Sequence, residues 1–464
     1  MSSKARLLTA LLALVAASAQ AQTPRAEARL LFTGDILVAR QVAAEMSVRK
    51  ISPWADFAGE FRGAALLGGN FEGAIGTECA QAAGQCFAAA ESSAKLLRDA
   101  GFTLVTAENN HAGDLGSDGR DRTRAVFQSA GLAAVDFEHS PVFMRAGAAT
   151  VAVIAVSLIP AADGRVEKIP SVALSQKLRT ARLLANLVVV SIHWGNELQD
   201  WPSENQQEAA RWLVAHGADL IVGHHPHVTQ AAACVAGRPV FYSLGNHLFD
   251  QKYPETKQGL IADCRIADGR LHCGALRTET PRGSSYPALA GRDRSSDETL
   301  AACTPTLGPD LDVNETTIKP ATWRADAPPE GIVLEGWRNG ALAWRSRRQQ
   351  LLSLQFTRTL ASEPLLFAIE KHPSSIDNET GPRPYVYAVG PSGLIARWRG
   401  SALAWPLIDA VESGTGVICA LHRGDSFLLP DAANPATRLA AYHWNGFGFT
   451  GIPTPPECNQ AFDN

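Results

Sequence analysis

DLIVGHHPHVTQAAACVAGRPVFYSLGNHLFD, residues 219–250, is the stretch from which the fold of this chain can be worked out. Its apolar run at residues 220–222 is typical of a buried strand, and His224, His225 and His227 follow where that strand would end. Neutral imidazole is the commonest protein ligand for transition metals, and the proline between the last two histidines restricts the backbone there. The cluster therefore indicates a metal site. The alternative is a set of loop histidines that bond only to backbone groups.

Further apolar runs alternate with helix-like segments on the N-terminal side of this stretch. Helical segments are expected at residues 95–101, 120–131 and 203–217, each ended by a glycine, and the last begins with the capping-box pattern S-x-x-Q. Strands are expected in the runs ARLLFTGD (28–35), AALLGGNFEG (64–73), FTLVTA (102–107), ATVAVIAVS (149–157) and LANLVVVSIH (184–193). This alternation predicts an α/β domain over residues 28–300.

Polar side chains come directly after five of the expected strands. In open α/β sheets the carboxyl ends of the strands form the edge where ligands bind, so these side chains are expected to converge. The candidates are Asp35, Asn70 with Glu72, Asn110 with His111, His193, and His225 with His227. Mixed imidazole, amide and carboxylate ligands suit Mn, Fe or Zn.

Each candidate also has a structural alternative. Asp35 can simply end a strand, Glu72 can accept backbone hydrogen bonds after a turn, and His111 can belong to a structural turn. Asp114 and Asp118 are typical turn residues. A metal site is therefore indicated by the whole set of strand ends and not by any one residue.

The N-terminus, residues 1–21, has the pattern of a cleavable secretory signal. Two basic residues precede an apolar segment, and small residues at positions 19 and 21 predict cleavage after Ala21. We therefore expect an exported protein, periplasmic or extracellular. Without residues 1–21 the chain keeps 40 of its 42 basic residues and all 46 acidic ones, a net charge of −6. That charge gives no electrostatic case for binding nucleic acid.

Eight cysteines in an exported chain favour disulfides over zinc. The dipeptide Asp268-Gly269 predicts a two-residue hairpin turn, and counting outward from it places Cys264 opposite Cys273. Cys79 and Cys86 are expected to close a local loop. The remaining pairings stay open.

At 464 residues the chain exceeds the roughly 250 to 300 at which single cores stop growing, so a second domain is expected. Residues 301–329 predict a linker, and residues 330–464 a small β-rich domain. Three phrases there place a Gly or Asn-Gly turn between apolar residues, at 337–344, 398–405 and 444–449. Their tryptophans either pack between hairpins or form a sugar-binding platform.

The motifs assembled above resemble those of the bacterial capsule synthesis protein family called CapA, which acts in poly-γ-glutamate production, and more distantly those of calcineurin-like metallophosphoesterases. The resemblance covers about residues 28–255 with order and spacing preserved. It is carried by FTGD (32–35), GNFEG (69–73), ENNHAGDLGSDG (108–119), SIHWGNE (191–197), ADLIVGHHPHV (218–228) and YSLGNHLFD (242–250).

The resemblance implies a four-layer, metallophosphatase-like α/β domain that holds one or two divalent transition metal ions. His111 matches the residue that protonates a leaving group in the phosphoesterases. The residues that match ligands are Asp35, Glu72, Asn110, His193, His225 and His227, with Asn70, His224, Asn246 and His247 as further candidates.

Two functions follow from these expectations. The first is a metal-dependent hydrolase that acts on a phosphoester or a cell-surface polymer, next to capsule machinery in a membrane. The second is a non-catalytic factor that binds or assembles the polymer with a degenerate metal cleft. The second is motivated by the first motif, which reads Asp35-Ile36-Leu37 where the phosphoesterases have D-x-H.

Overall fold

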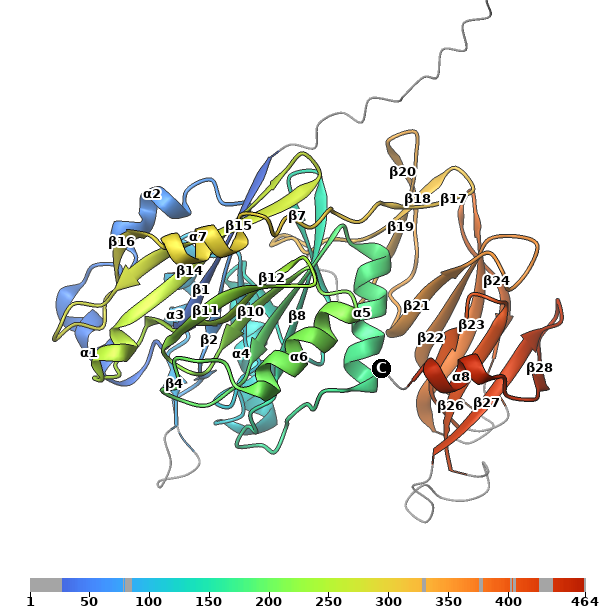
Figure 1. The fold of residues 1–464 in the computed structure, drawn as a ribbon, viewed down its shortest axis with the longest axis horizontal. Coiled ribbons are helices and arrows are strands. Elements are labelled where there is room, and N and C mark those ends of the chain that lie inside the picture. Colours follow the sequence, from blue (N-terminus) through green and yellow to red (C-terminus); the bar gives the residue numbers. More distant parts are fainter. Residues whose placement is uncertain are drawn as a thin grey trace, which may run out of the picture.

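The computed structural model describes residues 27–77, 79, 86–327, 331–374, 379–400, 403, 406–424 and 437–462. The expected signal segment, residues 1–21, lies outside these ranges. Figure 1 shows an α/β body and, beside it, a β-rich C-terminal region. Among the helices of the described ranges, none has the length and hydropathy needed to cross a membrane.

The first sheet of the body has β1 near its centre and contains strands of both directions. Strands β1 (Ala28–Ile36), β2 (Leu66–Phe71), β5 (Leu104–Thr106) and β6 (Ala133–Val135) are parallel neighbours. On the other side of β1, the antiparallel strands are β14 (Gln258–Ala267), β15 (Arg270–Glu279) and β16 (Ala288–Arg292), and the short β13 (Asn246–Leu248) pairs with β1 in parallel.

The second sheet runs in the order β11-β12-β10-β9-β8-β7. Its four inner strands are parallel, and every residue of β8 and β9 is buried, as expected for strands covered on both faces. The strands are β7 (Val142–Ala146), β8 (Ala149–Ser157), β9 (Leu187–His193), β10 (Leu220–His224), β11 (Thr229–Val235) and β12 (Arg238–Leu244).

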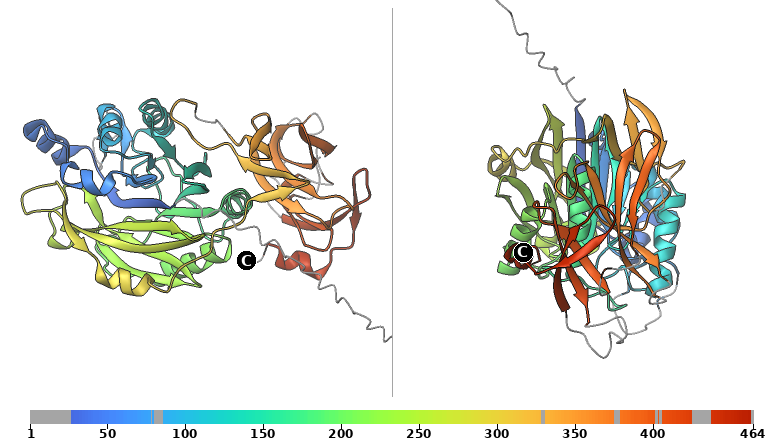
Figure 2. Two further views of the ribbon diagram at one scale, coloured as in Figure 1. Left: turned by 90° about the horizontal axis from the view of Figure 1, so that it is seen from above. Right: turned by 90° about the vertical axis from the view of Figure 1, so that its right-hand side faces the viewer.

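The two sheets pack face to face, and helices cover the outer face of each. The inner cluster joins side chains such as Leu30 and Phe32 of β1 to Val153 of β8 and Val189 of β9. The first sheet is covered by α1 (Arg40–Arg49), η1 (Ala55–Phe57), α2 (Ala58–Phe61), α3 (Ser92–Asp99) and α4 (Gly116–Ser129), and the second by α5 (Val172–Leu184) and α6 (Glu204–Ala215). The body therefore has four layers, visible in Figure 2.

Local signals in the sequence match these elements. Gly101 and Gly131 follow α3 and α4 with φ of 101° and 86°, the left-handed conformation that ends helices. Ser203 and Gln206 form both hydrogen bonds of the predicted capping box at the start of α6. Short elements fill the connections: β3 (Ala74–Ile75), β4 (Ala88–Ala89), η2 (Pro254–Lys257) and α7 (Arg294–Leu300).

All eight cysteines form disulfides. The two predicted bridges, Cys264–Cys273 and Cys79–Cys86, are confirmed, and the turn at Asp268-Gly269 has φ of 49° and 71°, as the hairpin requires. The pairings left open by the sequence are Cys234–Cys303 and Cys419–Cys458.

The C-terminal region consists of three successive four-stranded antiparallel sheets. Part of the stretch predicted as a linker, residues 301–329, lies in the first of these sheets, because β17 and β18 pair with the strands that follow. The first sheet consists of β17 (Leu311–Val313), β18 (Thr316–Pro320), β19 (Leu334–Arg338) and β20 (Ala341–Arg345). The second consists of β21 (Leu351–Thr357), β22 (Leu365–Pro373), β23 (Thr380–Gly390) and β24 (Gly393–Arg399). The third consists of β25 (Leu407–Glu412), β26 (Val417–Arg423), β27 (Thr437–Trp444) and β28 (Phe449–Ile452). The short α8 (Pro456–Gln460) follows.

Two of the three repeated phrases form hairpins. The Asn339-Gly340 turn joins β19 to β20, and Trp444 pairs with Phe449 across β27 and β28. Of the middle phrase, residues 401, 402, 404 and 405 lie outside the described part of the chain.

Helix α5 joins the body to the C-terminal region, as Figures 1 and 2 show. Its apolar face shares one core with the second sheet and with β21 to β23, and Thr180 Oγ1 accepts a hydrogen bond of 3.1 Å from the backbone of Leu354. Arg179 adds an ion pair of 2.6 Å to the buried Asp409 in β25. The contact is thus both apolar and charged.

Candidate metal centre

The carboxyl ends of β1, β2, β9 and β10 meet at one edge of the two facing sheets. Asn70 Nδ2 lies 3.4 Å from His193 Nδ1, which joins the end of β2 to the end of β9. Asp35 Oδ1 lies 3.2 Å from His224 Nδ1, which joins β1 to β10. Side chains that the sequence placed at separate strand ends are therefore neighbours across the two sheets.

Asp35 is fully buried at the centre of this edge. Its Oδ1 accepts a hydrogen bond of 2.9 Å from Asn70 Nδ2, and its Oδ2 lies 3.3 Å from His227 Nδ1. Burial acts to raise the pKa of Asp35, but the hydrogen bonds from His224 and His227 outweigh it and hold that pKa well below its usual range. The imidazoles of His224 and His227 therefore favour the charged form of Asp35 in the interior.

The backbone before Asp35 explains why glycine stands at position 34. A Cβ atom on Gly34 would lie 1.9 Å from the carbonyl oxygen of Gly245, which also accepts the Asp35 N–H at 3.0 Å. Only glycine permits this close approach, which brings the segment that begins with Asn246 alongside β1.

Glu72 follows β2 and is also fully buried. Among the described residues, neither carboxylate oxygen has a hydrogen-bond partner, and His227 Nε2 lies 3.5 Å from Oε1 without making a hydrogen bond. Burial raises the pKa of Glu72 to about 8, with His227 opposing that rise and Asp35, Glu197 and Asp114 adding to it. A buried carboxylate without a donor is costly unless a cation neutralises it.

The loop after β10 holds two histidines in a strained backbone conformation. His225 and His227 have φ of 97° and 59°, which side chains other than glycine seldom adopt and which costs on the order of 1–3 kcal/mol each. Burial lowers the pKa of His225 to about 4. For His227, burial acts to lower the pKa, but Glu72 and Asp35 raise it to about 9.

An amide network orients His193 at the end of β9. Its Nε2 lies 2.8 Å from Asn110 Oδ1, which places the ring proton at Nε2 and leaves Nδ1 as the acceptor. Asn109, which the sequence did not single out, donates from Nδ2 to Asn70 Oδ1 at 3.0 Å and so fixes the Asn70 amide. Burial, followed by the nearby His225, holds the pKa of His193 well below its ordinary value.

His111 lies at the rim of the centre. Its Nδ1 is 2.9 Å from Asp114 Oδ2, and its ring stacks on Phe87 with the ring centroids 3.7 Å apart. The carboxylate and the aromatic ring together fix the orientation of the imidazole. Asp114 also accepts a hydrogen bond of 2.7 Å from the backbone of Phe87, so it does more than form a turn.

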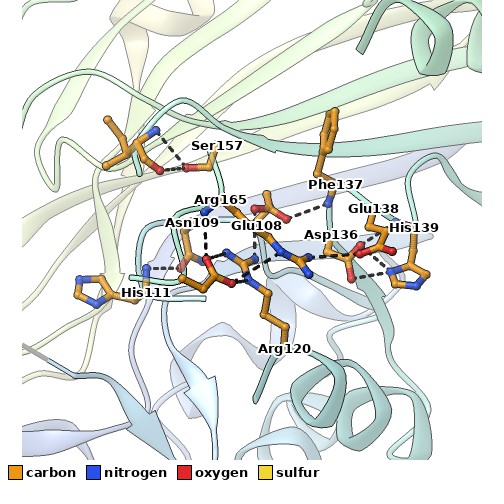
Figure 3. Close-up of polar contacts among 12 residues, drawn as sticks. Glu108, Asn109, His111, Arg120, Asp136, Phe137, Glu138, His139, Ser157 and Arg165 are labelled. Atoms are coloured by element: carbon orange, nitrogen blue, oxygen red, sulfur yellow. Dashed lines mark hydrogen bonds and ion pairs between the residues drawn. The ribbon is translucent and has the colours of Figure 1, made fainter. Parts of the chain in front are cut away.

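A buried ion network holds the loop that carries these residues. Arg120 of α4 donates to Glu108 Oε1 at 3.2 Å and to Asp163 Oδ2 at 2.6 Å, and Glu108 Oε2 accepts from the backbone of Phe137 at 3.0 Å. Figure 3 shows Arg120 and Glu108 beside Asn109 and His111. The network therefore anchors the first residue of the Glu108–His111 segment to α4.

Asn246 and His247 face different surroundings. Asn246 Oδ1 lies 2.9 Å from His227 Nδ1 and orients that ring. His247 instead packs against Phe57 and Phe61 at centroid distances of 5.3 and 6.3 Å. Its ring nitrogens lack hydrogen-bond partners within the described residues, and burial lowers its pKa to about 3. His247 is placed as a packing residue.

Two sets of three side chains in the described chain offer ligand atoms within 4.8 Å of one another. The inner triad is Asp35, Glu72 and His227, and the outer triad is Glu197, His225 and His227. The sequence analysis did not single out Glu197, although it stands only four residues beyond His193, the last residue of β9. The ligand atoms of both triads are carboxylate oxygens and imidazole nitrogens, which suit Mn, Fe or Zn.

The centre fits a divalent cation on physical grounds. Asp35 and Glu72 are buried carboxylates, and Glu72 has no donor among the described side chains and backbone groups. A divalent ion would neutralise both charges and use the neutral nitrogen of His225.

Comparisons with known proteins agree with the motifs. Residues 29–251 match the family model described as bacterial capsule synthesis protein PGA_cap. The chain is 27% identical over 296 residues to the capsule biosynthesis protein CapA of Bacillus anthracis, which covers 57% of this chain and 71% of that protein. It is 29% identical over 259 residues to the PGA biosynthesis protein CapA of Bacillus subtilis (strain 168), which covers 51% of this chain and 67% of that protein. With its residues 29–251, the chain belongs to the bacterial capsule synthesis protein family.

Proposed function

We propose that this protein is an exported capsule biosynthesis protein, acting on poly-γ-glutamate or a related surface polymer, with a metal-dependent, phosphoesterase-like hydrolase site. The observation that carries the proposal is the buried carboxylate of Glu72 beside Asp35 and His227, which receives no hydrogen bond from the described residues. The names of the two Bacillus relatives support the capsule assignment.

The layered body supports a metallophosphatase-like fold for residues 28–300. The β-rich region that follows begins at β17, before the predicted boundary at residue 330, and shares a core with α5. Four disulfides support an oxidising compartment, in keeping with the signal pattern of residues 1–21. Capsule machinery in a membrane is the proposed partner.

In the proposed reaction the side chains of this chain have distinct tasks. A bound divalent cation supplies Lewis acidity, which polarises a phosphoryl or acyl oxygen and acidifies water. Asp35, Glu72 and His227 hold the cation, and Asn246 orients His227 through the 2.9 Å contact. His111, aligned by Asp114, delivers a proton to the leaving group.

Metal analysis of the mature protein, starting at residue 22, tests the proposal together with assays on phosphoesters and polyglutamate. The protein should retain stoichiometric divalent metal and hydrolyse at least one substrate. His227→Ala should lose both properties, whereas Glu208→Gln on the exposed face of α6 should keep them. Absence of metal and of turnover in the parent protein would reject the hydrolase.

A second candidate is a non-catalytic factor that binds or assembles the polymer. Leu37, which stands where the phosphoesterase motif has its histidine, is fully buried and apolar, so this position offers no ligand. Equal retention of polyglutamate by metal-free and metal-loaded protein in a pull-down would favour this candidate. Turnover of a phosphodiester that is lost in His227→Ala would count against it.

A further inference from the structure

The loop between β9 and α6 passes over the histidine loop and is fixed to it. Trp194 donates from its backbone to the carbonyl of His224 at 3.1 Å, and Leu198 donates to the carbonyl of Pro226 at 2.9 Å. Gln230 Nε2 then donates to the carbonyl of Gln199 at 2.8 Å. Glu197 therefore lies between anchors on both sides and is held next to the two histidines that flank Pro226.

These anchors place the Glu197 carboxylate at the metal centre. Ligand atoms of Glu197, His225 and His227 all lie within 4.8 Å of one another. Whereas Asp35 and Glu72 are fully buried, Glu197 is exposed, so it approaches from the solvent side. The outer triad thus has an open face, as catalytic metal sites with three protein ligands require.

His225 provides an independent indication of a ligand at this position. His225 is only 7% exposed, and within the described chain its Nδ1 has no hydrogen-bond partner. A buried ring nitrogen is normally paired, and the backbone at His225 is strained as well. A cation in the outer triad would supply the missing partner.

We infer that Glu197 is a metal ligand that completes, with His225 and His227, the solvent-facing side of the centre and takes a divalent transition metal ion such as Zn²⁺. The inference rests on the proposed metal-dependent function and adds a ligand to it. An exposed carboxylate with no such role would leave metal affinity unchanged when neutralised.

Zn²⁺ titration by calorimetry on the full mature protein provides the first test. Glu197→Gln keeps the size of the side chain but removes its charge, and Glu208→Gln is a matched control on the neighbouring helix α6. Glu197→Gln should weaken Zn²⁺ binding by at least about tenfold, the lower end of the range for losing even a supporting group behind a ligand. Glu208→Gln should bind like the parent.

A spectroscopic test reports direct contact with the ion. Because all eight native cysteines are paired, Glu197→Cys introduces a single free thiol. With Co²⁺ bound, that thiol should produce a thiolate-to-cobalt charge-transfer band that Glu208→Cys lacks.

The outcomes separate this inference from the function on which it rests. If the parent binds Zn²⁺ and Glu197→Gln binds it equally well, the ligand assignment is overturned while the metal-dependent function stands. If the parent retains no divalent metal and binds neither Zn²⁺ nor Co²⁺, both fail. Weaker Zn²⁺ binding together with the cobalt band establishes Glu197 as a ligand.

Discussion

His227 stands between two buried carboxylates, with Nδ1 3.3 Å from Asp35 Oδ2 and Nε2 3.5 Å from Glu72 Oε1. Asp35 is the next-to-last residue of β1, Glu72 follows β2, and His227 lies in the loop after β10. One imidazole therefore links the edges of both sheets.

Glu72→Gln should stabilise the metal-free protein and abolish metal binding. Burial raises the pKa of Glu72 to about 8, so the carboxylate destabilises the fold increasingly as the pH rises from the unfolded value towards 8. We expect the free energy of unfolding of the metal-free variant to exceed that of the parent by about 1–3 kcal/mol at pH 8, and by less at pH 5. Urea denaturation at both pH values measures this, and a variant less stable than the parent at pH 8 would contradict it.

Metal removal should lower thermal stability. A ligand at a hundred times its Kd stabilises the folded state by about 2.7 kcal/mol, so chelation should lower the Tm of the metal-loaded protein. Asp35→Asn should have the same Tm with and without metal, because it removes a charge of the inner triad. Differential scanning calorimetry with and without Zn²⁺ checks both expectations.

Arg120→Ala should destabilise the protein strongly. The substitution leaves Glu108 and Asp163 without the guanidinium that binds both, and loss of one partner of a buried pair costs about 3–5 kcal/mol. Arg122→Ala, on the exposed side of the same helix, is the control and should cost less than about 1 kcal/mol. Urea denaturation of both variants measures the difference. Equal losses in the free energy of unfolding would show that the buried network stabilises the fold no more than an exposed arginine does.

Asp263→Asn should reduce the acid sensitivity of the fold. Burial acts to raise the pKa of Asp263, but the hydrogen bond from Arg29 at 2.7 Å and a second from Arg292 at 2.6 Å lower it. This stabilisation is present above the unfolded pKa of about 3.9 and is lost as the pH falls through the lower folded value. The variant should lose about 1–3 kcal/mol at pH 7 and less at pH 2, measured as free energies of unfolding.

His247→Phe should keep the affinity for Zn²⁺, because the ring packs against Phe57 and Phe61. Burial lowers the pKa of His247 to about 3, so the parent loses stability as the pH falls from about 6.5 towards 3 and the variant is spared that loss. Calorimetric Zn²⁺ titration and Tm values at pH 7 and pH 4 test this. A large loss of affinity would instead make His247 part of the metal centre.

Much of the fold could be predicted because its signals are short-range. The apolar runs, the glycines at positions 101 and 131, the capping box at Ser203 and the Asp268-Gly269 turn act within a few residues, and each matches an observed element. The polar strand ends were visible for the same reason, since the carboxyl ends of parallel strands share one edge of a sheet.

Long-range relationships could not be predicted in this way. No local pattern distinguishes Asn246, which contacts His227, from His247 beside it, which packs against Phe57. Glu197 lies beside His225 and His227 because the backbone of Leu198 donates a hydrogen bond to Pro226, in a segment far from it in the sequence.

By itself, the sequence determined several strands and helices of the body and the polar residues at the ends of strands, because backbone preferences and side-chain periodicity act over a few residues. Only the tertiary structure decided which of those residues meet, which cysteines beyond the two local pairs join, and that residues 311–320 pair as strands. The meeting of the strand ends depends on two sheets packing face to face, and the two remaining disulfides join cysteines 69 and 39 residues apart, beyond the range of any local pattern.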